Sequence, residues 1–298
     1  MHATRFRSWI SWLFIFWVGS TLFALPTFNT FFISISFCAI TASGFVINQY
    51  FDKDIDRLNP QKKTLPMAAG KLSSRTALIF FSVLTSFSFV LTALVDFSLF
   101  PFFLLFFGLG LAYSAGPLNL KKRPIIDLIA AGTCFGILPF LMGMQVVYPL
   151  SMDFSDPWIV RRYFDAFLCS IPFLLFQVAG HIFQAIGDYE ADRNSGTTTF
   201  VVKYGKEKSA KIGVGFFLLT AIIPLFYGLF GFLITKEFMG WYMLMLLVSL
   251  PVMVYLLNLY RSPVKKNVES LSKISKRFSP FVLIIVYFCI IVLRTIIK

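Results

Sequence analysis

The stretch INQYFDKDIDRLNP, Ile47–Pro60, decides how the rest of the chain is interpreted. A long apolar run ends at Asn48, and three aspartates, Asp52, Asp54 and Asp56, follow within the next eight residues. Carboxylates are among the side chains that a membrane tolerates least, and those beside a spanning segment are functional candidates by default. The stretch therefore predicts a membrane-spanning helix that continues beyond the apolar zone and carries acidic side chains there.

The composition of the whole chain agrees with a membrane protein. The 298 residues are 57% hydrophobic and 18% aromatic, with a mean hydropathy of +0.78. The apolar residues come in runs of about twenty, the length that crosses ~30 Å of hydrocarbon. These runs do not alternate with polar residues, which argues against a transmembrane β-barrel. We expect an all-α integral membrane protein in which residues 1–298 form a single membrane domain.

The apolar runs predict nine membrane-spanning helices in one bundle, arranged as two four-helix halves plus a final helix. Their approximate bounds are Trp9–Leu25, Phe28–Tyr50, Thr76–Val95, Leu99–Ala115, Ile125–Val147, Phe164–Ile186, Ile212–Ile234, Trp241–Leu259 and Pro280–Ile297. The longest connections, Phe51–Arg75 and Gly187–Lys211, follow the second helix of each half. No soluble domain fits between the runs.

The positive charges predict how the chain is oriented. With nine spans, 22 of the 27 Lys and Arg residues fall on the side of the N-terminus and of both long connections. Cytoplasmic loops carry such an excess, so we expect the N-terminus and the active site to face the cytoplasm, most simply from the inner cell membrane. The net charge of +13 comes largely from these short loops. It therefore indicates contact with membrane lipid and not with nucleic acid.

Two groups of polar residues share one spacing. The first stripe is Asn48, Asp52 and Asp56, and the second stripe is Gln184, Asp188 and Asp192. A spacing of four places each group on one face of a helix, with an amide one turn before two carboxylates. The sequence thus carries the same design at matching places in its two halves.

Paired carboxylates of this kind suit Mg²⁺. Two acids one turn apart repel each other unless a cation lies between them, and Mg²⁺ prefers oxygen ligands completed by substrate phosphates. One copy of Asp-x-x-x-Asp is common on a solvated helix end. Two copies on the same predicted side favour a shared site that holds a diphosphate through Mg²⁺.

The segments after the two stripes also correspond. TLPMAAGKLS follows Asp56 and TTTFVVKYGKE follows Asp192, with Gly70 and Gly205 at 14 and 13 residues after those aspartates. We interpret this as a weak internal duplication of about four helices, the alternative being chance similarity of two short polar loops.

These motifs resemble the signatures of the UbiA-type intramembrane prenyltransferases. The matching segments are NQYFDKDIDRLNPQKKTLPMAAG from Asn48, DYEADRNSGTTTFVVKYG from Asp188, and AYSAGPLNLKKR from Ala112. The helix number and the order and side of the motifs agree, so the resemblance covers nearly the whole chain. It implies transfer of a prenyl group from an isoprenyl diphosphate to a lipophilic, membrane-associated acceptor. The metal and diphosphate residues it implies are Asn48, Asp52, Asp56, Asp188 and Asp192.

Other residues on the same side are candidates for substrate binding or catalysis. The substrate-binding candidates are Asn48, Arg57, Lys121, Lys122, Gln184, Arg193 and Lys203, and the catalytic candidates are Asp54, Tyr113 and Glu190. The basic residues add charge around a diphosphate, and Tyr113 with Ser114 ends the fourth run. The reaction needs a base that takes the acceptor's proton. Asp54 and Glu190, which lie inside the motifs but off the stripes, are the candidates for this base. His181 is a weaker candidate on the acceptor side. For each, a solvated or structural role is the alternative.

Departures from the family pattern leave the acceptor open. Many members have Asp where this chain has Gln49, Arg where it has Thr64, and Asn where it has Gln184. Some features are closer to branches that prenylate aromatic quinone, tocopherol or chlorophyll precursors, and others to branches that prenylate carotenoids. An intramembrane terpene cyclase and, less favoured, a cation transporter remain alternatives. The sequence predicts neither the prenyl length nor the oligomeric state.

Overall fold

The structure is a computed structural model that describes residues 4, 6–59, 62–149, 155, 157–230, 284, 287–288 and 291–292. These residues form helices and connecting turns only. The long helices are α1 (Phe6–Phe23), α2 (Phe28–Leu58), α3 (Ser74–Val95), α4 (Phe100–Ser114), α7 (Pro157–Asn194) and α9 (Lys206–Phe230). The shorter elements are η1 (Phe97–Leu99), η2 (Leu120–Lys122), α5 (Pro124–Gly132), η3 (Thr133–Ile137), α6 (Leu138–Val147) and α8 (Phe200–Tyr204). The predicted all-α class is confirmed.

Seven of the nine predicted spans fall on these helices. Among the described residues, five helical segments are long and apolar enough to cross a membrane, and Trp9–Phe23 is a shorter apolar helix. The five are Phe28–Leu58, Ser74–Val95, Phe97–Ser114, Pro124–Val147 and Tyr163–Asn194. The eighth predicted span, and most of the ninth, lie outside the described residues. The chain is therefore a multi-pass membrane protein, and the count of nine remains a prediction.

The helices that carry the stripes are longer than a bilayer requires. With a rise of 1.5 Å per residue, the 31 residues of α2 span about 46 Å and the 38 residues of α7 about 57 Å. Helix α2 begins at a capping box between Thr27 and Thr30 and ends where the Asn59 amide donates to the Asp56 carbonyl. The prediction that the helices continue past the apolar runs and carry the aspartates of both stripes is confirmed.

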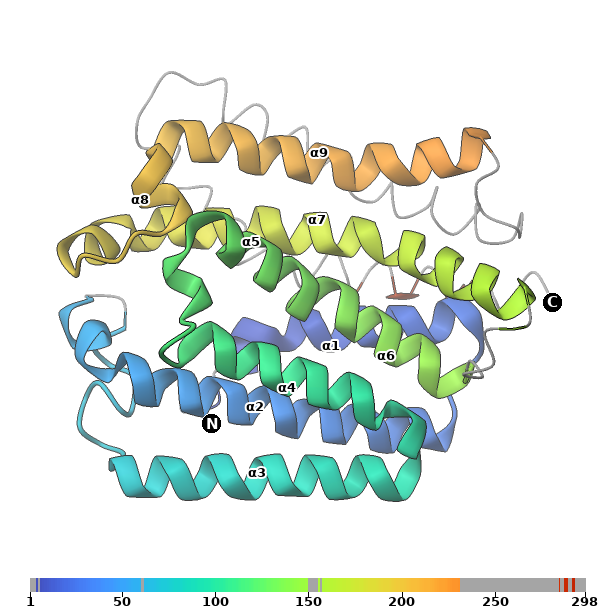
Figure 1. The fold of residues 1–298 in the computed structure, drawn as a ribbon, viewed down its shortest axis with the longest axis horizontal. Coiled ribbons are helices and arrows are strands. Elements are labelled where there is room, and N and C mark those ends of the chain that lie inside the picture. The colour runs from blue at the N-terminus through green and yellow to red at the C-terminus, as the bar shows by residue number, and fades with distance from the viewer. Residues whose placement is uncertain are drawn as a thin grey trace.

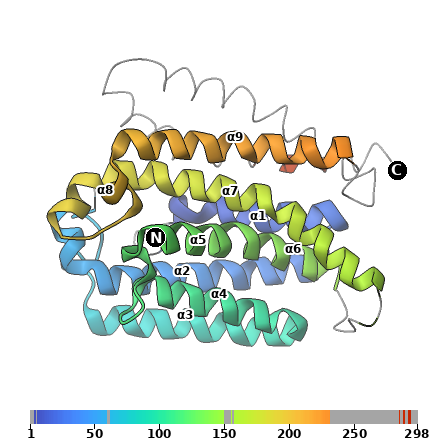
Figure 2. The same cartoon turned by 45° about the horizontal axis from the view of Figure 1, so that its top comes forward.

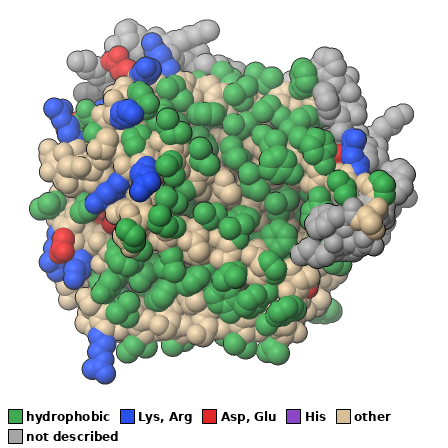
Figure 3. Space-filling view, viewed as in Figure 1, with side chains coloured by type: hydrophobic (Ala, Val, Ile, Leu, Met, Phe, Trp, Pro, Cys, Tyr) green, Lys and Arg blue, Asp and Glu red, His purple; other side chains and the backbone are tan. Residues whose placement is uncertain are grey.

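The helices run side by side, and the connections with the predicted motifs meet at one end (Figures 1 and 2). The loops after α2, α4 and α7 lie together there, at the left of Figure 1. Figure 3 shows Lys and Arg side chains gathered at this end and hydrophobic side chains over the middle of the bundle. The structure thus brings the predicted motifs together.

Close backbone contacts hold the centre of the bundle. A Cβ added at Gly19 of α1 would lie 2.1 Å from the carbonyl oxygen of Phe140, and one at Gly143 of α6 would lie 1.8 Å from that of Phe16. Small residues at helix crossings replace the hydrophobic driving force that is missing between helices in lipid. These glycines fix how closely α1 and α6 approach.

A buried hydrogen-bond cluster joins α2 to α3. The hydroxyl of Ser36 lies 2.9 Å from that of Ser88 and 2.6 Å from that of Thr92, and all three residues are fully buried. In an apolar surrounding a hydroxyl without a partner is costly, so this cluster sets the register of the two helices.

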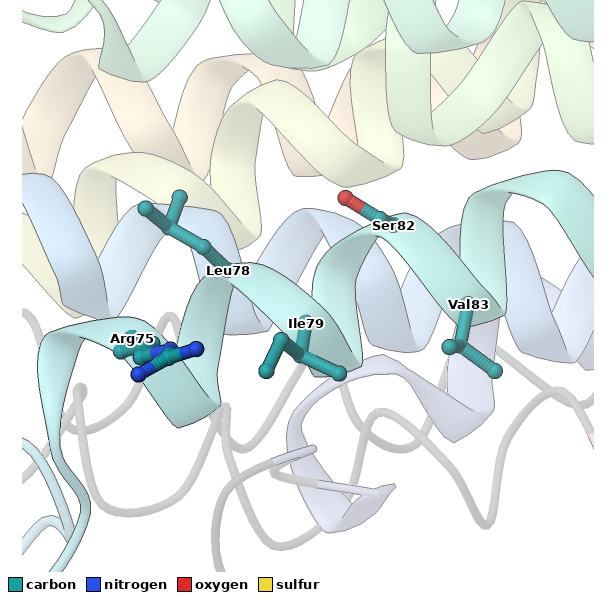
Figure 4. A pocket seen from close by; sticks show the side chains of 5 residues that line it. All are labelled: Arg75, Leu78, Ile79, Ser82 and Val83. Atoms are coloured by element: carbon teal, nitrogen blue, oxygen red, sulfur yellow. The ribbon is translucent and has the colours of Figure 1, made fainter.

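A shallow groove on α3 lies on the lipid-exposed surface. It is lined by Arg75, Leu78, Ile79, Ser82 and Val83, all of them exposed (Figure 4). The described residues that line it include no carboxylate or imidazole, so none of them is a base or a typical metal ligand.

Candidate active site

The first stripe is tied to the end of α4. The Asn48 amide nitrogen donates to Asp52 Oδ2 at 2.9 Å and to Ser114 Oγ at 3.0 Å. Asp56, one turn further along α2, is buried. The predicted order of an amide followed by two acids is therefore built into the helix, and Asn48 holds Asp52 in one orientation.

A lysine from another loop pairs with one aspartate of the first stripe. The Lys121 ammonium forms an ion pair with Asp52 Oδ1, and both side chains are largely buried. Lys121 belongs to η2, which follows Asn119 in a left-handed conformation with φ of 38°. The loop between α4 and α5 thus turns back toward α2 and delivers a cation to the stripe.

The second stripe is bonded to the segment that follows the first. The Lys62 ammonium lies 3.1 Å from Asp188 Oδ2, and the Asn59 amide donates to Asp188 Oδ1 at 3.3 Å. Asp192 is bonded to the Thr199 side chain. The C-terminal ends of α2 and α7 therefore meet, as the hypothesis of one shared site requires.

The loop after α2 has a defined fold. Met67 is buried against Val46 and Ala77, and Gly70 has φ of 70°, a conformation that favours glycine. Arg57 Nε donates to the carbonyl of Ala68 at 3.1 Å. These contacts hold the loop against α2, which fixes where Lys62 lies.

The loop after α7 has a comparable turn. The Thr197 amide donates to the Asp192 carbonyl at 2.9 Å, and Thr199 caps the short helix α8. Gly205 ends α8 with φ of 81° directly before α9. Gly70 and Gly205, matched in the sequence, thus both have positive φ shortly before a long helix. This similarity agrees with the internal duplication, which remains a prediction.

The two predicted bases lie in exposed ion pairs. Asp54, whose side chain is 74% exposed, lies 3.2 Å from Arg57, and Glu190, 68% exposed, lies 3.1 Å from Lys206. The remaining substrate-binding candidates are exposed: Lys122, Gln184, Arg193 and Lys203. Their roles remain predictions.

Next to the stripes lies a buried network in which the sequence reasoning identified Tyr113 and His181 as candidates but missed Asp127. Tyr113 Oη donates to Asp127 Oδ1 at 2.9 Å, and His181 Nε2 lies 3.0 and 3.1 Å from the two Asp127 oxygens. The Asp127 side chain is 2% exposed. A signal was available, because Asp127 is an acid inside the apolar run Ile125–Val147.

Aromatic rings continue from this network into the bundle. The ring of Tyr113 meets the ring of Phe135 edge-on at 6.3 Å, and Phe135 stacks on Trp12 at 3.8 Å between centroids. Trp12 also stacks on Phe45 at 5.5 Å. The polar end therefore adjoins a group of π faces, which attract cations.

The donors of the two stripes fit Mg²⁺. Within the described ranges, no group of three or more His, Cys, Asp and Glu side chains could by itself hold a metal ion. Mg²⁺ does not need such a cage, because it is usually bound by one or two carboxylates together with waters and substrate phosphates. Asp52 and Asp188 each hold a lysine ammonium, which shows that these two positions attract a cation. The carboxylates are hard oxygen donors of the kind that Mg²⁺ requires.

Comparison with known proteins agrees with this arrangement. The model of the UbiA prenyltransferase family matches residues 8–279. A digeranylgeranylglyceryl phosphate synthase of Thermococcus sibiricus is 32% identical over 182 residues, which are 61% of this chain and 58% of that protein. A lycopene elongase/hydratase of Corynebacterium glutamicum is 25% identical over 216 residues, 72% of this chain and 66% of that protein. The chain thus spans less than two thirds of the length of the first of these relatives.

A solved structure shares the fold. A UbiA homolog from Archaeoglobus fulgidus, bound to GPP and Mg²⁺, superposes with a TM-score of 0.71 over 96% of this chain and 98% of that one. The sequences are 20% identical. At this identity the similarity establishes the common architecture.

Proposed function

This chain belongs to the UbiA prenyltransferase family, and we propose that it transfers a prenyl group from an isoprenyl diphosphate to a lipophilic acceptor within the membrane, with Mg²⁺. One observation carries the proposal. The carboxylates of α2 and α7 lie at one end of the bundle, where Lys62 joins the loop of the first stripe to the second. Polar ligands at the end of an apolar, aromatic-lined interior suit a substrate with a diphosphate head and an isoprenyl tail.

The acidic residues hold the metal and the diphosphate in this proposal. The metal-binding residues are Asp52, Asp56, Asp188 and Asp192, with Asn48 beside them. Bound Mg²⁺ neutralises diphosphate charge and makes it a better leaving group. Asn48 keeps Asp52 oriented through its bond at 2.9 Å. Lys121 and Lys62 are already at the carboxylates and turn toward the diphosphate when it binds, adding positive charge where the leaving group develops negative charge.

The apolar side of the site guides the prenyl group. Breaking the carbon–oxygen bond leaves positive charge on an allylic carbon, and aromatic faces stabilise such a cation without trapping it. Tyr113, Phe135 and Trp12 supply these faces in contact with one another. The packed rings also exclude water, which would otherwise capture the cation in place of the acceptor.

The acceptor is proposed only as a class. The two relatives are named for a glyceryl phosphate product and for lycopene, which differ in chemistry. Aromatic quinone, tocopherol or chlorophyll precursors, carotenoids and other lipids all remain within the proposed class. The site is placed on the cytoplasmic side of a cell membrane because of the distribution of Lys and Arg. Labelling from that side at Lys63 and from the opposite side at Ser155 tests this orientation.

The test is a transfer assay with the purified full chain in lipid vesicles. A labelled prenyl diphosphate, Mg²⁺ and a panel of lipophilic acceptors are incubated with the protein, and products are identified by mass spectrometry. We expect a prenylated acceptor whose formation stops with chelator and returns with Mg²⁺. Full turnover in excess chelator would contradict a metal–diphosphate site.

The same assay separates the alternatives. A cyclised hydrocarbon formed without any acceptor would indicate a terpene cyclase, in which the cation is attacked by its own chain. Cation flux across the vesicles without diphosphate consumption would indicate a transporter, although the carboxylates lie at helix ends and not at the midplane that transport sites favour.

A further inference from the structure

In the buried network of Asp127, Tyr113 and His181, the ring of Tyr113 faces the prenyl group, but Asp127 and His181 have no role in the reaction as described so far. It joins three helices, since Tyr113 ends α4, Asp127 lies in the first turn of α5 and His181 lies within α7. Asp127 is 2% exposed and His181 is 22% exposed at their side chains. A carboxylate so deeply buried beside an apolar run is expensive to maintain, which points to a function.

The charge balance of the network favours taking up a proton. In the described part of the chain, the partners of the Asp127 carboxylate are Tyr113 and His181, and neither carries a fixed positive charge. The N-terminus of α5 and the hydrogen bonds with Tyr113 and His181 present partial positive charge to this carboxylate. A buried negative charge without a fixed cation is relieved when the neighbouring imidazole becomes protonated.

The hydrogen bonds also decide which ring nitrogen of His181 can accept that proton. Nε2 contacts both oxygens of Asp127, so the neutral ring carries its proton on Nε2 and donates it there. Nδ1 then keeps a free lone pair, and among the described residues it forms no hydrogen bond. A carboxylate that fixes the tautomer of a histidine in this way is how a general base is prepared in hydrolytic triads.

The position of His181 matches that of the acceptor. His181 precedes Asp188 by seven residues, which places it on the same face of α7 and about 10 Å further from the diphosphate end. Tyr113 is adjacent to Ser114, which is bonded to Asn48 of the first stripe. The acceptor attacks the prenyl carbon from the side opposite the leaving diphosphate, and that side is the apolar one where the network lies.

We propose that His181 is the catalytic residue that accepts the acceptor's proton, and that Asp127 and Tyr113 are its positioning residues. In this step the bond between the prenyl carbon and the diphosphate oxygen breaks, and its electron pair leaves with diphosphate. The acceptor supplies the electron pair of the new bond and loses a proton to Nδ1 of His181. The resulting imidazolium pairs with Asp127 and releases the proton to water as the products leave. This inference rests on the proposed function.

The test compares His181→Gln with the wild-type chain in the vesicle assay. Glutamine keeps an N–H donor for Asp127 but has no nitrogen that accepts a proton. We expect kcat to fall about 100-fold, the usual contribution of a general base. We expect KM and Kd for the prenyl diphosphate, measured with Mg²⁺, to stay within about twofold, because the carboxylate stripes are intact.

Chemical rescue separates a base from a structural residue. His181→Ala removes the ring, and added imidazole is expected to raise its rate about tenfold or more, since a free base can then occupy the space. Asp127→Asn should lower kcat while Asp165→Asn, which alters a buried carboxylate paired with Arg161 elsewhere on α7, leaves it within about twofold.

Each outcome is decisive. Wild-type kcat in His181→Gln, or no rescue of a folded His181→Ala by imidazole, would overturn the inference and leave the proposed function standing. If His181→Ala does not fold, His181→Gln alone decides. A wild-type chain that binds no prenyl diphosphate and transfers to no acceptor would overturn the proposed function and the inference with it.

Discussion

The two carboxylate stripes have the same spacing but different surroundings. In the first, Asn48 is bonded to Asp52 and Ser114, so its amide is part of a fixed contact between α2 and α4. In the second, the corresponding amide of Gln184 is exposed on α7. The sequence repeats the acidic residues, whereas the hydrogen bonds and ion pairs that hold each stripe are set by the segments that pack against it.

The cations show the same asymmetry. Asp52 is paired with Lys121 and Asp188 with Lys62, and both lysines come from the connections before α5 and α3. Lys203, on α8 in the connection after the second stripe, is exposed, with its ammonium 5.4 Å from the Tyr204 ring. In the described residues, Lys62 from the loop after the first stripe thus pairs with an aspartate of the second, which is why we propose that the two stripes act as one unit.

The largest expected loss of activity tests whether the two stripes form one site. Asp52→Ala and Asp188→Ala each remove a carboxylate from one stripe, and each should lower kcat/KM by roughly 10²–10³-fold because the metal and diphosphate lose an anchoring group. The double variant should be little worse than either single one, since residues that act as a unit are far from additive. Steady-state turnover at matched expression gives the three values.

A clean multiplication of the two losses would contradict a shared site. It would mean that each stripe acts separately, despite the contact of Asn59 and Lys62 with Asp188. Mg²⁺ titration of each variant provides the control, because loss of a ligand should raise the metal concentration needed for half-maximal turnover.

The next effect concerns the lysines. Lys62→Met and Lys121→Met keep the apolar stem but remove the charge, so a largely buried carboxylate loses its lysine partner and keeps its hydrogen bond from Asn59 or Asn48. We expect each to raise KM for the prenyl diphosphate about 30-fold, within the range for breaking a buried charge pair. Lys203→Met, the matched change in the second loop, should stay within about threefold, as for an exposed charge. Initial rates over a range of diphosphate concentrations measure all three.

A rise in KM for Lys203→Met as large as that for Lys62→Met would contradict the difference between the two stripes. The second stripe would then receive its charge from its own loop, as the sequence-based prediction for Lys203 holds. Both connections would in that case supply charge to the bound diphosphate, and the asymmetry between the two stripes would be lost.

Much of the fold follows from patterns that are local in sequence. Apolar runs of about twenty residues predicted the helices, and the spacing of four placed Asn48, Asp52 and Asp56 on one face before any tertiary contact was known. The helical extensions of α2 and α7 were predicted because the spacing of four continues one helix face and because acidic side chains are costly within the apolar zone.

The features of the candidate site that the sequence did not predict depend on tertiary contacts. Which lysine reaches which aspartate is decided by the left-handed turn at Asn119 and by the packing of Met67, and neither has a periodic signal. Asp127 was missed because its partners, Tyr113 and His181, are 14 and 54 residues away in sequence. Asp54 and Glu190 were selected for their place in the motifs, although the helices turn them outward into exposed pairs.

A smaller effect compares the two amides directly. Asn48→Ala removes the bonds to Asp52 and Ser114, so Asp52 loses its orientation, and the rate should fall about tenfold, as for a partner that orients a metal ligand. Gln184→Ala should cost about twofold or less, because the side chain is exposed. Turnover and thermal unfolding of both variants decide the matter. Equal losses would show that the amides act alike once substrate is bound.

The smallest expected effect concerns the acids between the stripe positions. Asp54→Ala breaks a pair with Arg57, and Glu190→Ala a pair with Lys206, and both carboxylates are mostly exposed to water. Exposed ion pairs contribute about 0–1 kcal/mol, so the free energy of unfolding should change by about 0.5 kcal/mol or less and the rate by about twofold or less. Asp54 lies about 200° around α2 from Asp52, which makes it the matched control for the stripe. If Asp54→Ala or Glu190→Ala lost as much activity as Asp52→Ala, that residue would be the base, and His181 would not. Activity measurements on these aspartate and glutamate variants therefore test both the role of the stripes and the identity of the proton acceptor.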